Sequence, residues 1–482
     1  MSLQSRMAKG VMWSLLEKGG QQGISFLVFM VIARLVGPTE YGLANICFVF
    51  FTIANLLILA VVDGVVSLQI EDDQRLSTLF WTALAVGLGF AAIAILGAQP
   101  LAEAMDEPRL RDLILWFSAI PLLLSLASVP TMLVLKELDF RVYALRSIAA
   151  SLIGGAVGIA GAFQGMGAYA LILQQITLFT VSNVVVWLSV RWRPRLRFDR
   201  ASLAETIRPG IRMAGTMIVT VAEREVPRIL IVAFLGPLAL GFYSFVARVR
   251  YAIQDIFVNP PFSVFYPSLA KLNHDRAAQQ QMLGLFVVAT GVLIFPTLAC
   301  AAVAAPLYVT LFFGGKWADV VPLLQVFILC GAVLPLQYVV REMMRTHNRL
   351  HRFLRLQVAY VAAVLAASAA ALPFGLLAMA AATLAVGVAF LPVYFRALQR
   401  WEGVALWGDL AGLWRPLAAS GAMAAAIAGY AASPWAAADP WFRLLLALLA
   451  GGAAFGLAGA LLLRRDVRRL VGFFRRRRVG EA

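Results

Sequence analysis

The sequence has few charged residues and very little cysteine or histidine. Only 14% of its 482 residues are charged, whereas about a quarter is usual for a soluble protein. Cys47, Cys300 and Cys330 lie in apolar segments without a close partner, so neither a disulfide framework nor a metal site is predicted. His347 and His351 have helical spacing but stand among arginines, which favours a solvated basic loop over a metal site.

Short motifs of common enzymes are also missing. The sequence contains no glycine-rich phosphate loop followed by lysine and serine, no His-Glu-x-x-His and no Gly-x-Ser-x-Gly. We therefore expect a protein that is not an enzyme and that has neither a metal, a cofactor nor an ATP site.

Long apolar runs dominate what is present. Hydrophobic residues make up 61% of the chain, and runs of roughly twenty residues, each long enough to cross a bilayer, recur along it. This predicts an all-α polytopic membrane protein with about fourteen transmembrane helices. The approximate spans are 11–33, 43–63, 78–97, 113–134, 147–164, 168–190, 211–235, 238–260, 282–305, 319–340, 356–373, 376–395, 414–432 and 441–463. The first span contains Glu17 and Lys18, which a cleavable signal peptide would not, so we expect it to be retained.

The formal net charge of +16 follows from where the 41 lysines and arginines lie. Most are in alternate loops and in the C-terminal tail, and cytoplasmic segments of membrane proteins are enriched in these residues. The basic clusters lack the stacking aromatics of nucleic-acid sites. Both termini are therefore predicted to be cytoplasmic, with no nucleic-acid partner. The few bases predicted on external segments are Arg34, Arg109, Arg111, Lys316 and Arg443.

A short motif occurs twice, at one common offset. Gly37-Pro38 and Gly42 correspond to Gly236-Pro237 and Gly241, and each copy joins two long apolar segments. Gly-Pro is expected to end a helix, and the following glycine to let the chain turn closely. These six residues are candidate structural hinges. We predict two pseudo-symmetric six-helix lobes, 1–198 and 199–400, followed by an appended helix pair with a basic tail, 401–482.

Charged residues inside the predicted spans are the candidate functional residues, because a charge in a span usually faces a wet cavity or a partner. They fall in the first, seventh and eighth spans: Glu17, Lys18, Glu223, Arg224, Glu225, Arg228, Arg248, Arg250 and Asp255. Guanidiniums suit phosphate groups, and the carboxylates suit a cation or a proton. The near parity of acids and bases also fits internal ion pairs between or along helices. Both interpretations stay open at this point.

The sequence resembles a known family at several places. These are Gly10-Val11-Met12-Trp13-Ser14, the stretch Ala33 to Gly42, the loop Lys136 to Arg141 and the repeat Leu235 to Tyr243. Over about residues 5–400 the chain resembles the polysaccharide transporter (Wzx-type) flippases of the multidrug/oligosaccharidyl-lipid/polysaccharide exporter superfamily.

The resemblance implies a V-shaped pair of lobes around a cationic cavity in the bacterial inner membrane. The substrate would be an undecaprenyl-pyrophosphate-linked oligosaccharide, moved by alternating access, with H+ or Na+ as a coupling ion and polysaccharide polymerase and export machinery as partners. Lys18, Arg224, Arg228, Arg248 and Arg250 would hold the pyrophosphate. Glu17, Glu223, Glu225 and Asp255 would serve in gating or ion coupling.

Other functions stay open. A peptidoglycan-precursor flippase of the same superfamily fits the charges, whereas a multidrug exporter of organic cations is expected to have an acidic cavity. A membrane-embedded polymerase or glycosyltransferase usually carries a larger external loop or cytosolic domain than the loops of about twenty residues predicted here. A scaffold within an export complex is compatible with the sequence.

Overall fold

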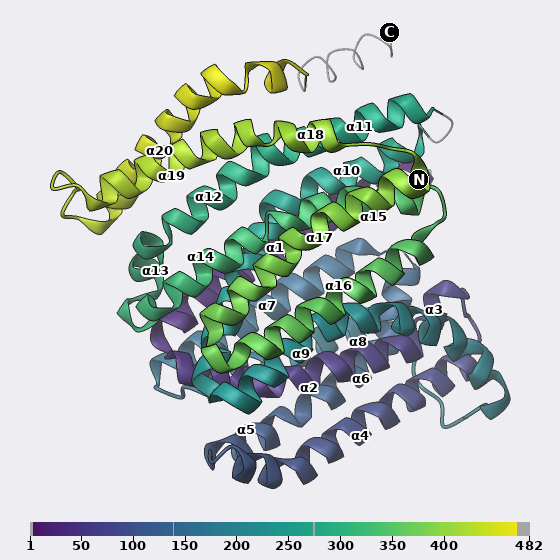
Figure 1. Cartoon of the computed structure of the whole chain (residues 1–482). Coiled ribbons are helices and arrows are strands. Elements are labelled where there is room, and N and C mark those ends of the chain that lie inside the picture. Colours follow the sequence, from purple (N-terminus) through teal and green to yellow (C-terminus); the bar gives the residue numbers. More distant parts are fainter. Residues whose placement is uncertain (1–2, 138, 273–274, 470–482) are drawn as a thin grey trace. The chain divides into compact units, whose positions relative to one another are not determined.

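The computed structural model describes the backbone of residues 3–137, 139–272 and 275–469. Within these ranges, side chains are described from Gly19 onward except at positions 201, 202, 212, 213, 216, 220, 261, 263, 264 and 267. The secondary structure of the described residues is helical, without a β-strand (Figure 1). The prediction of an all-α protein is therefore confirmed.

Twelve helices among the described residues are long and apolar enough to cross a membrane. The prediction of a polytopic membrane protein is confirmed, but the number fourteen is not. The first predicted span contributes only a shorter apolar segment, Gly19–Leu35. The seventh and eighth are assigned together as α9 (Arg200–Ile253), in which the non-helical Gly236 separates two helical stretches at the predicted break, and they contribute a single candidate span, Met217–Val258.

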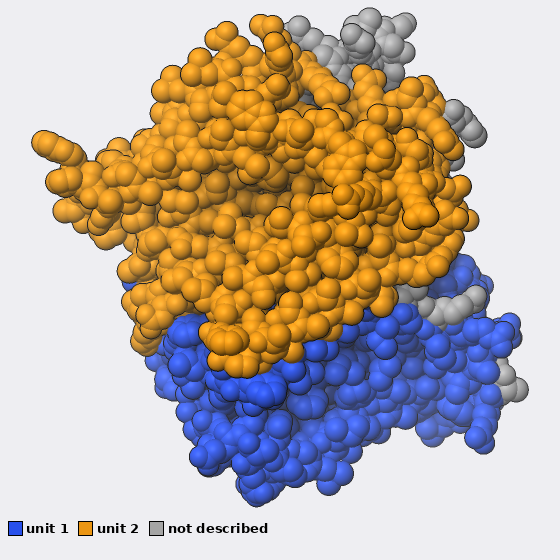
Figure 2. Space-filling model, viewed as in Figure 1, with its two compact units in different colours: residues 1–244 blue, residues 245–482 orange. Residues whose placement is uncertain are grey.

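Two compact units make up the chain, residues 1–244 and residues 245–482 (Figure 2). The boundary falls inside α9, so this helix contributes to both units. Compactness and internal repetition are different criteria, and the division of the chain at residues 198 and 400 stays a prediction.

Unit 1 contains eight helices before α9. They are α1 (Leu3–Leu35), α2 (Pro38–Val62), α3 (Gly64–Ser67), α4 (Asp73–Ala104), α5 (Arg109–Phe117), α6 (Ala119–Lys136), α7 (Phe140–Phe163) and α8 (Ala168–Ser189). Helices α7 and α8 lie side by side, joined by a four-residue turn in which Gly165 and Gly167 have φ angles of 76° and 55°. Glycine reaches these angles without steric cost, and the predicted tight hairpin is present.

The basic segment that follows α8 is fixed on the start of α4. Trp81 Nε1 donates a hydrogen bond of 2.8 Å to the carbonyl of Arg195, and the amide of Arg195 donates to Ser77 Oγ at 3.0 Å. The Arg195 guanidinium lies 2.8 Å from the Asp73 carboxylate. The connection predicted between the spans 168–190 and 211–235 is too long, because α9 already begins at Arg200.

Unit 2 contains the end of α9 and the remaining helices. They are η1 (Gln254–Val258), α10 (Asn259–Ala270), α11 (Arg276–Ala289), η2 (Thr290–Ile294), α12 (Phe295–Val303), α13 (Ala305–Phe313), η3 (Gly315–Val320), α14 (Val321–Cys330), α15 (Val333–Thr346), α16 (Leu350–Ala371), η4 (Leu372–Phe374), α17 (Leu376–Glu402), α18 (Trp407–Gly412), α19 (Trp414–Ala432) and α20 (Pro440–Leu462).

The last two helices form a pair that packs on α12 and α13 within unit 2. Ala304, Ile427 and Ala447 form its buried contact, with Tyr308 and Met423 partly buried against them. Much of the surface of α20 stays exposed, with Leu457 and Leu461 among its most accessible side chains. An apolar surface of this kind is suited to lipid.

In both motifs the Gly-Pro pair and the glycine that follows it have different structural roles. The predicted helix break is confirmed at the first motif, because α1 ends at Leu35 and α2 begins at Pro38. The break is also present at the second motif, where Gly236, with a φ of 78°, is non-helical and separates two helical stretches of α9. The predicted turns at Gly42 and Gly241 are wrong, since both glycines lie inside helices.

Gly42 and Gly241 instead allow two backbones to meet within unit 1. A Cβ atom on Gly42 would overlap the carbonyl of Pro237, and one on Gly241 would overlap the carbonyl of Pro38. In each motif, therefore, the second glycine packs against the proline carbonyl of the other motif. Further along the same two helices, a Cβ on Gly210 would overlap the carbonyl of Ala60. Only glycine permits approaches this close.

Candidate functional site

The middle of α9 carries a buried ion pair inside the apolar span. Arg228 Nη1 lies 3.2 Å from Glu225 Oε2, one helical turn away, as the spacing predicts. The Glu225 side chain is 3% exposed and the Arg228 side chain 13%. Arg228 Nε is buried and has no hydrogen-bond partner among the described residues. One carboxylate therefore satisfies only part of this guanidinium, which has further N–H groups to donate.

The other candidates of the first and seventh spans differ in accessibility. Glu223 is partly buried and Arg224 is exposed, and both make further contacts. Glu17 and Lys18 lie on α1, but their side chains are outside the described residues.

The candidates of the eighth span belong to unit 2, at the end of α9 and in the π-helix η1. Arg248, Arg250 and Asp255 are all partly buried. The guanidinium of Arg250 lies 4.8 Å from the centre of the Tyr251 ring, and Asp255 Oδ1 accepts a 2.8 Å hydrogen bond from Asn259. π-Helical turns are rare and occur often at functional sites. Here one coincides with the charged segment that the sequence singles out.

This charged segment is connected to α15 through a tyrosine. Gln254 Nε2, in η1, lies 3.2 Å from the hydroxyl of Tyr338, and the Arg341 guanidinium lies 4.1 Å from the centre of the Tyr338 ring. Arg341 also donates to Glu342 at 2.6 Å. Glu342 is buried and contacts Arg345, 3.6 Å away. Unit 2 thus contains a continuous polar row from η1 along α15.

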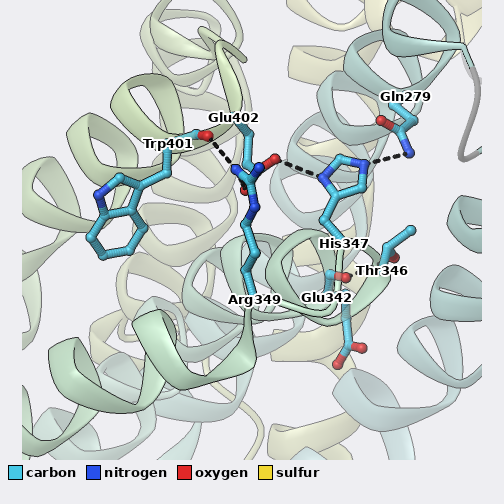
Figure 3. A network of polar contacts seen from close by, with 7 residues as sticks. All are labelled: Gln279, Glu342, Thr346, His347, Arg349, Trp401 and Glu402. Atoms are coloured by element: carbon cyan, nitrogen blue, oxygen red, sulfur yellow. Dashed lines mark hydrogen bonds and ion pairs between the residues drawn. The ribbon is translucent and has the colours of Figure 1, made fainter.

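A second polar network lies where α15 and α17 end, and sequence analysis did not find it (Figure 3). His347 Nδ1 lies 2.7 Å from Glu402 Oε2, while His347 Nε2 lies 3.4 Å from Gln279 Nε2. Arg349 Nη1 donates to Glu402 Oε1 at 2.9 Å and to the carbonyl of Trp401 at 2.8 Å. His347 and Arg349 therefore share the Glu402 carboxylate as a common partner.

The expectation of a solvated basic loop at His347 is therefore wrong. The side chain is 17% exposed and Glu402 only 2%. Of the predicted loop 341–355, the residues up to Thr346 belong to α15. The described residues contain no group of three or more His, Cys, Asp or Glu side chains that could hold a metal ion.

Removing the Glu402 carboxylate is expected to destabilise unit 2 strongly. Glu402→Ala leaves His347 and Arg349 without their shared acceptor in a buried site, at a cost of about 3 kcal/mol. Thermal unfolding of the purified protein measures the change. Glu71→Ala is the control, because the Glu71 side chain is 86% exposed beside Lys136 and such pairs contribute roughly 1 kcal/mol or less. Equal melting temperatures for both variants would contradict a structural role for the network.

Comparison with known proteins identifies the family. Residues 31–322 match the family described as "Polysaccharide biosynthesis protein". The chain belongs to this family. The match covers more than half of the chain, and it confirms the resemblance indicated by the motifs around Gly37-Pro38 and Lys136.

The chain is similar to named relatives whose names agree with this family assignment. It is 26% identical over 334 residues to the succinoglycan biosynthesis transport protein ExoT of Rhizobium meliloti, covering 68% of this chain and 67% of that protein. It is 23% identical over 335 residues to the lipopolysaccharide biosynthesis protein WzxC of Escherichia coli, covering 69% and 68%. Teichuronic acid biosynthesis protein TuaB of Bacillus subtilis is 21% identical. The chain is thus a multi-pass membrane protein of the polysaccharide biosynthesis family, and one of its relatives is named as a transport protein.

Solved structures show which fold the family member adopts. The lipid II flippase MurJ in an inward closed conformation aligns with a TM-score of 0.74 at 13% identity, covering 95% of this chain and 100% of that one. An inward-facing multidrug resistance MATE transporter aligns with a TM-score of 0.62 at 11% identity, covering 79% and 96%. The chain therefore shares its fold with this flippase and this transporter.

Proposed function

We propose that this protein is a flippase that moves undecaprenyl-pyrophosphate-linked oligosaccharide units across the bacterial inner membrane by alternating access. The units would be precursors of an exopolysaccharide or an O-antigen. The transport protein ExoT, named for succinoglycan biosynthesis, and WzxC, named for lipopolysaccharide biosynthesis, support this substrate class.

The observation that carries the proposal is the Arg228 guanidinium inside the apolar span of α9. A buried charge in a span costs at least a few kcal/mol, so such residues are rare and usually functional. Glu225 offsets part of this cost, but the buried Nε of Arg228 has no acceptor among the described residues. A diphosphate would supply such acceptors, and guanidinium binds phosphate oxygens in a planar, bidentate geometry.

The chemical problem of flipping explains the need for these groups. A diphosphate and several sugars shed water when they leave the aqueous phase, and burying unpaired charges is very costly. Lys18, Arg224, Arg228, Arg248 and Arg250 would replace the lost hydration of the pyrophosphate. The lipid tail needs no such replacement, because it stays in hydrocarbon throughout.

Four further assignments belong to the proposal. Glu17, Glu223, Glu225 and Asp255 would gate the site or couple it to H+ or Na+. The glycine-proline positions Gly37, Pro38, Gly42, Gly236, Pro237 and Gly241 would be the structural hinges of the movement. Both termini would be cytoplasmic, because most lysines and arginines then lie on the cytoplasmic side, and polymerase and export machinery would be partners.

Complementation tests the proposed function. In a bacterium that lacks its own oligosaccharide flippase, the wild-type protein is expected to restore surface polysaccharide. Arg248→Gln is expected to reduce it by about tenfold or more, since one charge-assisted hydrogen bond contributes ~1.5–3 kcal/mol. Arg208→Gln is the control, because Arg208 is an exposed residue of α9 outside the charged segment. Membrane levels of each variant are measured in parallel.

Other outcomes would overturn the proposal. Full activity of well-expressed Arg248→Gln and Arg228→Gln variants would exclude the α9 arginines as the substrate site. Rescue of a strain depleted of its peptidoglycan-precursor flippase, without restoration of surface polysaccharide in any tested strain, would favour the alternative substrate class.

A further inference from the structure

Unit 1 contains a cavity that none of the candidate residues above lines. Its volume is about 390 Å³, and α1, α2, α6, α7 and α8 all contribute to its wall. Apolar side chains such as Ile58, Leu59 and Phe179 form part of the lining. The polar lining includes Gln21, Asn55, Thr131, Arg146, Gln175 and Ser182.

Arg146 is the charged residue of this lining. Its Nη1 donates a 3.1 Å hydrogen bond to Thr131 Oγ1, and its guanidinium lies 4.4 Å from the centre of the Tyr143 ring. Its Nε is buried without a hydrogen-bond partner among the described residues. These two neighbours orient the guanidinium but do not neutralise it.

No carboxylate lines the cavity within the part of the chain that the structure describes. Arg146 therefore differs from Arg228, which has Glu225 one turn away. A partly buried cation that has no counter-ion among the described side chains is costly, and such a cost usually has a functional reason. The predicted spans leave Arg146 in the connection between 113–134 and 147–164, whereas the structure places it inside α7.

The lining indicates which chemistry would complete the site. A guanidinium with free N–H groups binds a carboxylate or a phosphate oxygen. The amides of Asn55 and Gln175 and the hydroxyl of Ser182 can each donate to and accept from hydroxyl groups. The volume lies at the small end of the range of ligand pockets, about 300–1,000 Å³. A cavity of this volume suits an acidic group together with the sugar ring that carries it, but not a whole oligosaccharide.

We propose that this cavity binds one oxyanion of a hydroxylated group, with Arg146 on the charge and the amides and hydroxyls around it. The oxyanion is either the carboxylate of an acidic sugar or a phosphate. The identity of the natural ligand rests on the proposed function, since a lipid-linked oligosaccharide offers both groups. The site itself is independent of transport.

Binding to the purified full-length protein tests the site. Thermal unfolding is followed with glucuronate, inorganic phosphate, pyrophosphate and glucose, because a ligand that binds the folded state raises the melting temperature. We expect glucuronate or the phosphates to raise it, and glucose to have no comparable effect. A response to glucuronate alone assigns the site to an acidic sugar, and a response to the phosphates alone assigns it to the phosphate.

Two variants with equal loss of charge make the test specific. Arg146→Gln is expected to weaken anion binding by about tenfold or more. Arg141→Gln, at an exposed position of the same helix, is expected to bind like wild type. Without ligand, Arg146→Gln is expected to melt no lower than wild type, because the lost cation has no carboxylate partner among the described residues. Arg146→Lys keeps the charge and is expected to bind with intermediate strength.

Several results would overturn the inference. One is a wild-type protein that no anion stabilises, and another is an anion response of equal size in Arg146→Gln. A lower melting temperature of Arg146→Gln with an unchanged anion response would make Arg146 a structural residue. Failure of complementation with intact binding through Arg146 would remove the proposed function and leave the site. Complementation without anion binding would remove only the site.

Discussion

Replacing both members of the Glu225–Arg228 pair by glutamine is expected to restore stability without restoring transport. Either single change, Glu225→Gln or Arg228→Gln, leaves one buried charge uncompensated and is expected to lower stability by about 3 kcal/mol. The double variant contains no uncompensated charge, so most of this loss is recovered. Transport stays at least about tenfold below wild type, because the phosphate has lost its charge-assisted hydrogen bonds.

The measurement needs two readouts on the same four proteins. Thermal unfolding of purified wild type, both single variants and the double variant gives the stability cycle. Surface polysaccharide in the flippase-deficient strain, divided by the amount of protein in the membrane, gives transport. Recovery of both quantities in the double variant would make the pair purely structural, and the proposed pyrophosphate site would then lose Arg228.

Much of the fold can be predicted from the sequence because its signals are local. Apolar runs of membrane length indicate helices wherever they occur, and proline ends a helix through its own missing N–H group. The break before Pro38 is an example. The number of spans is harder to predict. The predicted helix break is present at Gly236, yet the two helical stretches that it separates form one candidate span, Met217–Val258. A kink and a chain reversal both begin with the same Gly-Pro pair.

The sequence does not predict the role of Gly42 either, but the reason is different. Glycine allows both a turn and a close helix contact, and only the partner decides between them. That partner is the carbonyl of Pro237, far along the sequence, so nothing near Gly42 reveals it. The repeat was visible, but the fact that its two copies face each other was not.

The candidate site shows the same limit. The Glu225–Arg228 pair was predictable because it follows helical spacing within one helix. Glu402 lies 55 residues from His347, and Arg146 lines a cavity built from five helices. Arginines near the end of a predicted span resemble ordinary cytoplasmic bases, so composition alone places them in a loop. Burial separates Arg146 from Arg141, and burial is a property of the fold.

Gly42→Ala is expected to be among the most damaging small substitutions in the protein. The added methyl would overlap the carbonyl oxygen of Pro237, which belongs to a helix backbone and cannot rotate away like a side chain. Relief requires α2 and α9 to move apart, which costs about 3 kcal/mol as overpacking of a core. Gly241→Ala is expected to have a similar effect, because its Cβ would overlap the carbonyl of Pro38.

Gly37→Ala, within the same motif, is the matched control. Gly37 has a φ of −77°, and a Cβ atom there would have no neighbour within 4 Å, so its stability should change by roughly 0.5 kcal/mol or less. Thermal unfolding of the three variants separates the close contact from the helix break. If Gly42→Ala melts like Gly37→Ala, the close approach of α2 and α9 is absent from the folded protein. If Gly42→Ala is destabilised as expected, the second glycine of each motif is required where the two repeats meet, and the Gly-Pro pair alone does not define the motif.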